Sequence, residues 1–124
     1  MGLSLQGWIE IKNRYRDEWN GVVKIGIPLL QGGRNAAMYD HFFYGGDAIV
    51  GCRGLPEIFS PEIEAERDQI EHSAFSCKSW LNWREMLLID WDNIGDDWQL
   101  LYDMMEILSK SHGEENVRMV IWFY

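Results

Sequence analysis

The stretch that decides the fold is residues 117–124, Val-Arg-Met-Val-Ile-Trp-Phe-Tyr, within a chain of 124 residues. Only Arg118 interrupts this run of β-branched, aromatic and other apolar residues. A short run that is apolar on both faces is typical of a strand in the centre of a sheet. We therefore predict a central strand over residues 117–124.

Two further strands are predicted near the N-terminus. Residues 3–12 place their aliphatic side chains on one parity, which is the period-two pattern of a half-buried strand. The polar segment 14–21 ends in Asn20-Gly21, and β-branched residues resume over 22–27. This order favours a β-hairpin with the polar segment as its connection.

Helix signals lie mainly in the second half. Ser60 before Pro61 predicts a helix over 61–71, and the spacing of Asn82 and Glu85 predicts a capping box that starts a short helix. The strongest helical pattern covers residues 96–111, where Gly113 follows as a terminator. We expect one α+β domain over residues 1–124: an antiparallel sheet of three or more strands, with helices packed on one face.

The apolar face predicted for residues 96–111 is wider than one contact with a sheet requires. Either the helix lies between the sheet and other helices, which we favour, or the edge of this face contacts a partner. A homodimer through this face stays open.

The charge is unevenly distributed. Residues 1–56 hold six basic and five acidic residues, whereas residues 57–124 hold five basic and fifteen acidic ones, within a total formal charge of −9. Direct binding of nucleic acid by the second half is disfavoured, although a small basic group at Arg14, Arg16 and Lys24 could supply a separate footprint. An acidic face attracts basic protein surfaces and resembles nucleic acid to a positively charged groove.

The candidate partner-binding residues are acids of two segments. They are Glu62, Glu64, Glu66 and Asp68 in the predicted helix 61–71, together with Asp92, Asp96 and Asp97. The expected partner is a host protein or complex with a basic surface. The alternative is that these acids only keep the protein in solution.

Arginines and aromatic residues beside glycines suggest a second kind of site. Arginine binds phosphate, glycine-rich backbone can cradle anions, and aromatic rings stack on bases, so Arg34, Arg53, Phe42 and Tyr44 are candidates for a nucleotide ligand. The alternative is that the aromatic side chains belong to the core.

Catalytic and metal-binding patterns are weak. His72 is the one candidate for hydrolytic catalysis, with a carboxylate or Cys77, but no nucleophile elbow accompanies it. No spacing typical of a metal site or dinucleotide-binding loop occurs, so we expect neither metal nor cofactor. Cys52 and Cys77 are expected to stay reduced. No apolar run approaches the roughly 20 residues of a membrane-spanning helix, and we expect a cytoplasmic protein that does not bind membranes.

The chain also resembles an uncharacterised family of small bacteriophage and prophage proteins. The resemblance is carried by Met1-Gly2 with Gly7-Trp8-Ile9-Glu10, Arg53-Gly54-Leu55-Pro56, His72-Ser73, Ser79-Trp80-Leu81-Asn82-Trp83-Arg84-Glu85, and Val117-Arg118 with Trp122-Phe123. The family typically opens with Asp-Ile-His where this chain has Ser4-Leu5-Gln6, and closes with Asp where it has Tyr124. It implies a phage setting and no particular activity. We therefore expect a phage-type binding protein that inhibits a bacterial antiviral defence, with sequestration of a nucleotide immune signal and hydrolysis through His72 as alternatives.

Overall fold

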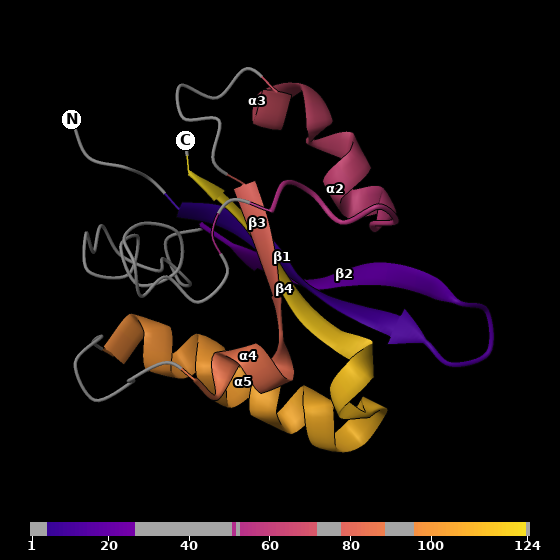
Figure 1. Ribbon diagram of the computed structural model, residues 1–124, viewed down its shortest axis with the longest axis vertical. Coiled ribbons are helices and arrows are strands. Elements are labelled where there is room, and N and C mark those ends of the chain that lie inside the picture. Colours follow the sequence, from indigo (N-terminus) through magenta and orange to yellow (C-terminus); the bar gives the residue numbers. More distant parts are fainter. Residues whose placement is uncertain (1–4, 27–50, 52, 72–77, 89–95, 124) are drawn as a thin grey trace.

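A four-stranded antiparallel sheet forms the centre of the protein, in the order β2-β1-β4-β3 (Figure 1). The computed structural model describes residues 5–26, 51, 53–71, 78–88 and 96–123. Its strands are β1 (Leu5–Asn13), β2 (Glu18–Ile25), β3 (Lys78–Asn82) and β4 (Val117–Phe123). The predicted α+β class, with an N-terminal hairpin and a C-terminal strand in one antiparallel sheet, is confirmed.

Strand β4 is central, as its apolar sequence predicts. It pairs with β1 on one side and with β3 on the other. Its buried apolar residues alternate between the two faces of the sheet, with Val117, Met119 and Ile121 on one face and Val120 and Trp122 on the other. Strand β3 was not predicted, because five residues that include lysine, serine and asparagine show no clear apolar pattern.

The turn of the hairpin lies at residues 14–17, earlier than Asn20-Gly21. The Asn13 side chain accepts a hydrogen bond from the backbone N–H of Tyr15 at 2.9 Å, and the Asp17 N–H bonds to the Asn13 carbonyl at 3.1 Å. Asp17 takes the left-handed φ of 55° that this turn requires. Gly21 instead lies within β2, where a Cβ atom would come within 2.8 Å of the Trp8 ring.

Helices cover both faces of the sheet, which corrects the expectation of helices on one face (Figure 1). On the face of Ile9, Leu81 and Met119, called the first face, lie α4 (Trp83–Met86) and α5 (Asp96–His112). On the opposite, second face lie α2 (Pro61–Ala65) and α3 (Arg67–Glu71). The reason is that β4 carries buried apolar residues on both faces, and each face requires a cover.

The predicted helix 61–71 is present in two parts. Ser60 accepts a hydrogen bond from the Ile63 N–H at 3.3 Å, which confirms it as the N-cap. The chain leaves helical geometry at Glu66, so α2 and α3 are separate. Ile63 and Ile70 are both fully buried and attach the two short helices to the second face.

On the first face, the predicted capping box and long helix are confirmed. Asn82 and Glu85 exchange hydrogen bonds with each other's backbone N–H at 2.9 and 3.1 Å, and Gly113 ends α5 with a φ of 100°. Leu101 and Met105 of α5 are fully buried, whereas Leu100 and Ile107 are 45% and 64% exposed. The edge of the broad apolar face is therefore not enclosed by the described residues. A 3-10 turn, η2 (Glu114–Asn116), leads from α5 into β4. No helix in the described ranges has the length and hydrophobicity needed to cross a membrane.

Candidate binding surface

A buried ion pair fixes the start of α2 on the second face. Glu10 of β1 and Arg118 of β4 are paired residues of the sheet, and the Arg118 Nε donates to Glu10 Oε1 at 2.7 Å. The other oxygen of Glu10 accepts from the Ser60 N–H at 2.7 Å, and Arg118 Nη2 donates to the Ile58 carbonyl at 2.5 Å. The segment that leads into α2 is therefore attached to the two central strands by charged hydrogen bonds.

The surroundings of Arg118 are largely closed to solvent. Its side chain is about nine-tenths buried, Glu10 is completely buried, and the guanidinium lies 3.7 Å from the centre of the Trp19 ring. Burial lowers the pKa of Arg118, while the charge of Glu10 and its hydrogen bond oppose the change. Arginine still remains charged at neutral pH.

A second ionic contact fixes the junction between α2 and α3. The Lys24 Nζ donates to both oxygens of Glu66 at 2.7 and 2.8 Å, and the Trp8 indole N–H donates to the same carboxylate at 2.9 Å. The Lys24 ammonium also lies 5.3 Å from the ring centres of Trp8 and Trp122. Of the predicted partner-binding acids, Glu66 is thus occupied within the protein, and Lys24 is not free to form a basic footprint.

The remaining acids of α2 and α3 differ in exposure. Glu62 is half-buried, and its Oε2 lacks a hydrogen-bond partner in the described part of the chain. Glu64, Asp68 and Glu71 are exposed. Arg67 bonds to Glu64 at 3.4 Å and to Glu71 at 3.1 Å, and its pKa is raised chiefly by the hydrogen bond to Glu71. We call the exposed group of Glu64, Arg67, Asp68 and Glu71 the acidic surface, and it has three negative charges against one positive charge.

A cavity lies beside Arg118, between the strands, α4 and η2, and two tryptophans line it. It has a volume of about 340 Å³ and is lined by Trp19, Trp80, Asn82, Arg84, Glu114, Glu115, Val117 and Arg118. Because Arg118 also binds the Ile58 carbonyl, the cavity adjoins the segment that leads to the acidic surface. Ile58 is 61% exposed and Glu57 is exposed in the same segment. Apolar and acidic side chains are therefore close together on this part of the molecule.

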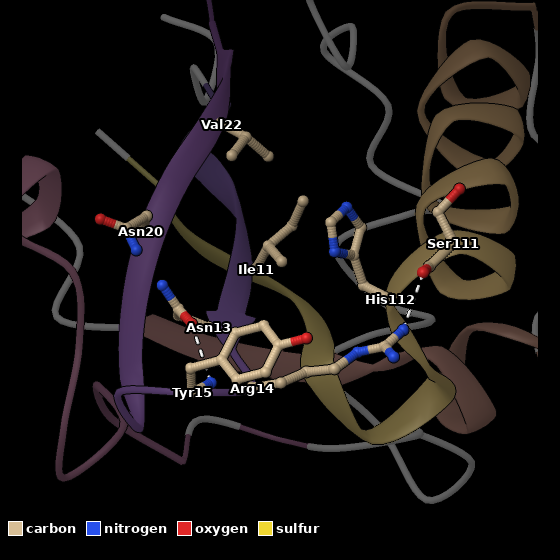
Figure 2. A pocket seen from close by; sticks show the side chains of 8 residues that line it. All are labelled: Ile11, Asn13, Arg14, Tyr15, Asn20, Val22, Ser111 and His112. Carbon is tan, nitrogen blue, oxygen red and sulfur yellow. Dashed lines mark hydrogen bonds between the residues drawn. The ribbon is translucent and has the colours of Figure 1, made fainter.

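A groove of about 610 Å³ lies on the other side of the sheet, between the β1–β2 hairpin and the end of α5. Figure 2 shows Ile11, Val22 and the His112 ring facing one another across it. Arg14 crosses its lower edge and donates to the Ser111 carbonyl at 2.8 Å. The groove is separate from the acidic surface and differs from it in charge.

Arg53, a candidate for phosphate binding, is engaged within the protein. Its guanidinium forms an ion pair with Glu85, donates to the Trp80 carbonyl at 3.1 Å and lies 4.7 Å from the centre of the Trp80 ring. Because Glu85 also caps α4, Arg53 connects its own segment to the sheet and to that helix. A phosphate would have to compete with this ion pair.

Several predicted site residues lie outside the described residues. They are Arg34, Phe42, Tyr44, His72 and Asp92, together with Cys52 and Cys77. Asp96 and Asp97 open α5, but the structure does not describe their side chains. In the part of the chain that is described, no three histidine, cysteine or acidic side chains form a group able to hold a metal ion.

Sequence reasoning missed Glu10 and Arg118, although Arg118 is the one charged residue of an otherwise apolar strand. Such a residue needs a buried partner of opposite charge, and this is the signal that could have found the pair. Comparison with known proteins adds no further candidate, since no protein family, curated protein or solved structure matches the chain.

Proposed function

We propose that the protein is a phage-type inhibitor that binds a basic host protein through the acidic surface of α2 and α3. One observation carries the proposal: Glu64, Asp68 and Glu71 remain exposed together, while Glu10 and Glu66 use their charge to attach this region to the sheet. The partner we propose is a nucleic-acid-binding protein of a bacterial antiviral defence, whose positive groove the acids would occupy.

The fixed position of the acidic surface supports this function. Acids on a rigid support are arranged before the partner arrives, so less conformational freedom is lost on binding. Their field also increases the rate of encounter with a positive groove, an effect that salt weakens. Arg67 spaces the acids by holding Glu64 and Glu71 on its two sides.

The neighbouring tryptophan cavity supports binding to a protein in particular. Tryptophan is enriched among the residues that contribute most to protein interfaces, especially where it lines a pocket. Trp19 and Trp80 border the cavity, and the exposed Ile58 adds apolar area near them. A partner can therefore combine contacts to acids with burial of apolar surface, and the protein acts by occupying a site without catalysis.

A pair of matched charge reversals tests the proposal. Asp68→Lys with Glu71→Lys removes two acids of the acidic surface, and Asp103→Lys with Glu106→Lys changes the same residue types at the same spacing on the exposed side of α5. Each tagged protein is incubated with a host lysate that contains the defence proteins, and bound proteins are quantified. We expect recovery of the partner to fall by about tenfold or more for the first variant and to stay unchanged for the second.

Both variants should melt within a few degrees of the natural protein, because the four acids are exposed or half-buried, and the ion pairs of Glu71 and Glu106 and the hydrogen bond of Asp103 lie at the surface. Equal recovery with both variants would contradict the proposal, because the acidic surface would then have no particular role. Recovery of no host protein by the natural sequence would contradict it as well.

A further inference from the structure

We propose that the groove between the β1–β2 hairpin and the end of α5 binds a small nucleotide, with its phosphate at Arg14 and His112 and its base against Tyr15. This site is independent of the acidic surface, which lies over the opposite face of the sheet. It also differs from the nucleotide site predicted from Arg34 and Arg53, since it uses neither residue.

The size and the walls of the groove fit a small ligand. A volume of about 610 Å³ lies within the range of roughly 300–1,000 Å³ that is typical of ligand sites. Ile11 and Val22 provide an apolar side, and Val22 is 47% exposed although it is aliphatic. Figure 2 shows both side chains directed into the space that His112 closes from the helix.

The charge of the groove points to an anion. The chain has 20 acidic residues against 11 basic ones, yet none of the eight residues that line the groove is acidic. Arg14 is the one lining residue that is always positively charged, and the His112 ring offers an N–H donor beside it. A phosphate that enters from solvent therefore meets the charge of Arg14 and N–H donors of the side chains around it, without a carboxylate among the lining residues.

Arg14 is held in a position suited to a phosphate. Its Nη2 donates to the Ser111 carbonyl at 2.8 Å, and this carbonyl belongs to the last turn of α5. A guanidinium has five N–H donors in a planar fork, and this is the one hydrogen bond that Arg14 makes to the described residues. The remaining donors are available to oxygen atoms of a phosphate, which arginine binds with two parallel hydrogen bonds.

A second cavity limits where the phosphate can lie. It has a volume of about 440 Å³, shares Arg14 and His112 with the groove, and also contains Lys12, Asp17 and Glu115. Lys12 is already paired with Asp17 at 2.6 Å, and Glu115 adds a negative charge. We therefore place the phosphate in the groove and not in the second cavity. Asn13 and Asn20 are its polar neighbours there.

Tyr15 indicates a base rather than phosphate alone. Its side chain is 94% exposed at the rim of the groove, and Figure 2 shows its ring beside Asn13 at the open edge. An exposed aromatic ring gains from stacking on a base, an interaction worth about 1–3 kcal/mol. The amides of Asn13 and Asn20 can donate to and accept from the polar edge of that base.

The experiment measures binding of adenosine, guanosine, cytidine and uridine monophosphates to the full chain, with inorganic phosphate and the four nucleosides as separate arms. Binding is followed by calorimetry and by backbone amide shifts in NMR spectra. We expect at least one mononucleotide to bind and to shift amides of the hairpin and of the last turn of α5. The nucleosides and inorganic phosphate should each bind about tenfold or more weakly, because each lacks one part of the site.

Three variants locate the site. Arg14→Gln should weaken nucleotide binding by about tenfold or more, whereas Arg16→Gln, in the same exposed turn but outside the groove, should change it less than about twofold. Tyr15→Ala should weaken nucleotide binding without changing that of inorganic phosphate. Equal losses for Arg14→Gln and Arg16→Gln would overturn the proposal in favour of unspecific attraction. Absence of any amide shift at about 5 mM nucleotide would also overturn it.

Discussion

Replacing Glu10 by glutamine is expected to lower the free energy of unfolding by about 3–5 kcal/mol, which is a large part of the stability of a small domain. Glu10 is completely buried, and its two oxygens bind Arg118 and the Ser60 N–H. Glutamine has nearly the same shape but leaves the buried guanidinium without its counter-charge. The amide N–H₂ of glutamine would also face either the Arg118 guanidinium or the Ser60 N–H, so that two donors oppose each other. Urea unfolding followed by circular dichroism measures the loss.

The matched control for Glu10→Gln is Glu106→Gln, the same change in an exposed i,i+4 pair with Lys110. Its expected effect is within about 0.5 kcal/mol. A double-mutant cycle with Arg118→Met separates the ion pair from other effects, because removal of both charges avoids leaving one of them unpaired. A loss of less than about 1 kcal/mol for Glu10→Gln, or strict additivity in the cycle, would show that the pair does not hold α2 in place.

Gly7→Ala is the second change with a large expected effect, a loss of about 3 kcal/mol in the free energy of unfolding. Gly7 lies in β1 between its partners Ile25 and Ile121, so strands confine it on both sides. An added Cβ would overlap the Val120 carbonyl oxygen and approach the Ile121 side chain within 2.9 Å. Backbone atoms of a central strand cannot move away without loss of hydrogen bonds in the sheet.

Gly54→Ala provides the comparison for Gly7→Ala. Gly54 has a φ of 83°, but among the described residues, its chain neighbours aside, no atom lies within 4 Å of the position of an added Cβ. The cost there is conformational, about 1–2 kcal/mol. The denaturant midpoints of the two variants are measured, and their difference shows how much more a steric overlap destabilises the protein than backbone strain does. A Gly7→Ala protein as stable as the natural one would contradict the pairing of β1 with β4 as described.

Much of the fold could be predicted from local patterns. The apolar run of residues 117–124, the Ser60-Pro61 helix start and the capping box of Asn82 and Glu85 are local signals, and the structure confirms all three. The predicted connection of the hairpin, residues 14–21, contains the turn at 14–17 but ends too late, because Asn20-Gly21 resembles a turn pair, whereas here Gly21 allows a close approach of Trp8 within the sheet. The position of α2 and α3 on the second face was not predicted, because a pattern along the chain does not show which face of a sheet a helix covers.

The candidate sites could be predicted only in part, since ion pairs between distant segments are invisible in a single sequence. Glu66 and Glu64 look alike in the sequence, but Lys24 occupies the first and leaves the second exposed. Arg53 likewise appears available for a ligand until Glu85, 32 residues further along the chain, is placed beside it. The groove at Arg14 and His112 is lined by the hairpin and by the last turn of α5, and no local sequence pattern shows that these two segments lie close together.

The competition between this protein and DNA for one purified partner tests the central claim most directly. The host protein that the acidic surface recovers is bound to a labelled DNA duplex, and increasing amounts of the natural protein or of Asp68→Lys with Glu71→Lys are added. We expect the natural protein to displace the duplex completely, and we expect this displacement to weaken as the salt concentration rises. The variant should need at least about tenfold more protein for the same displacement. A stable complex of partner, duplex and inhibitor together would contradict the account, because the acids would then not occupy the nucleic-acid groove.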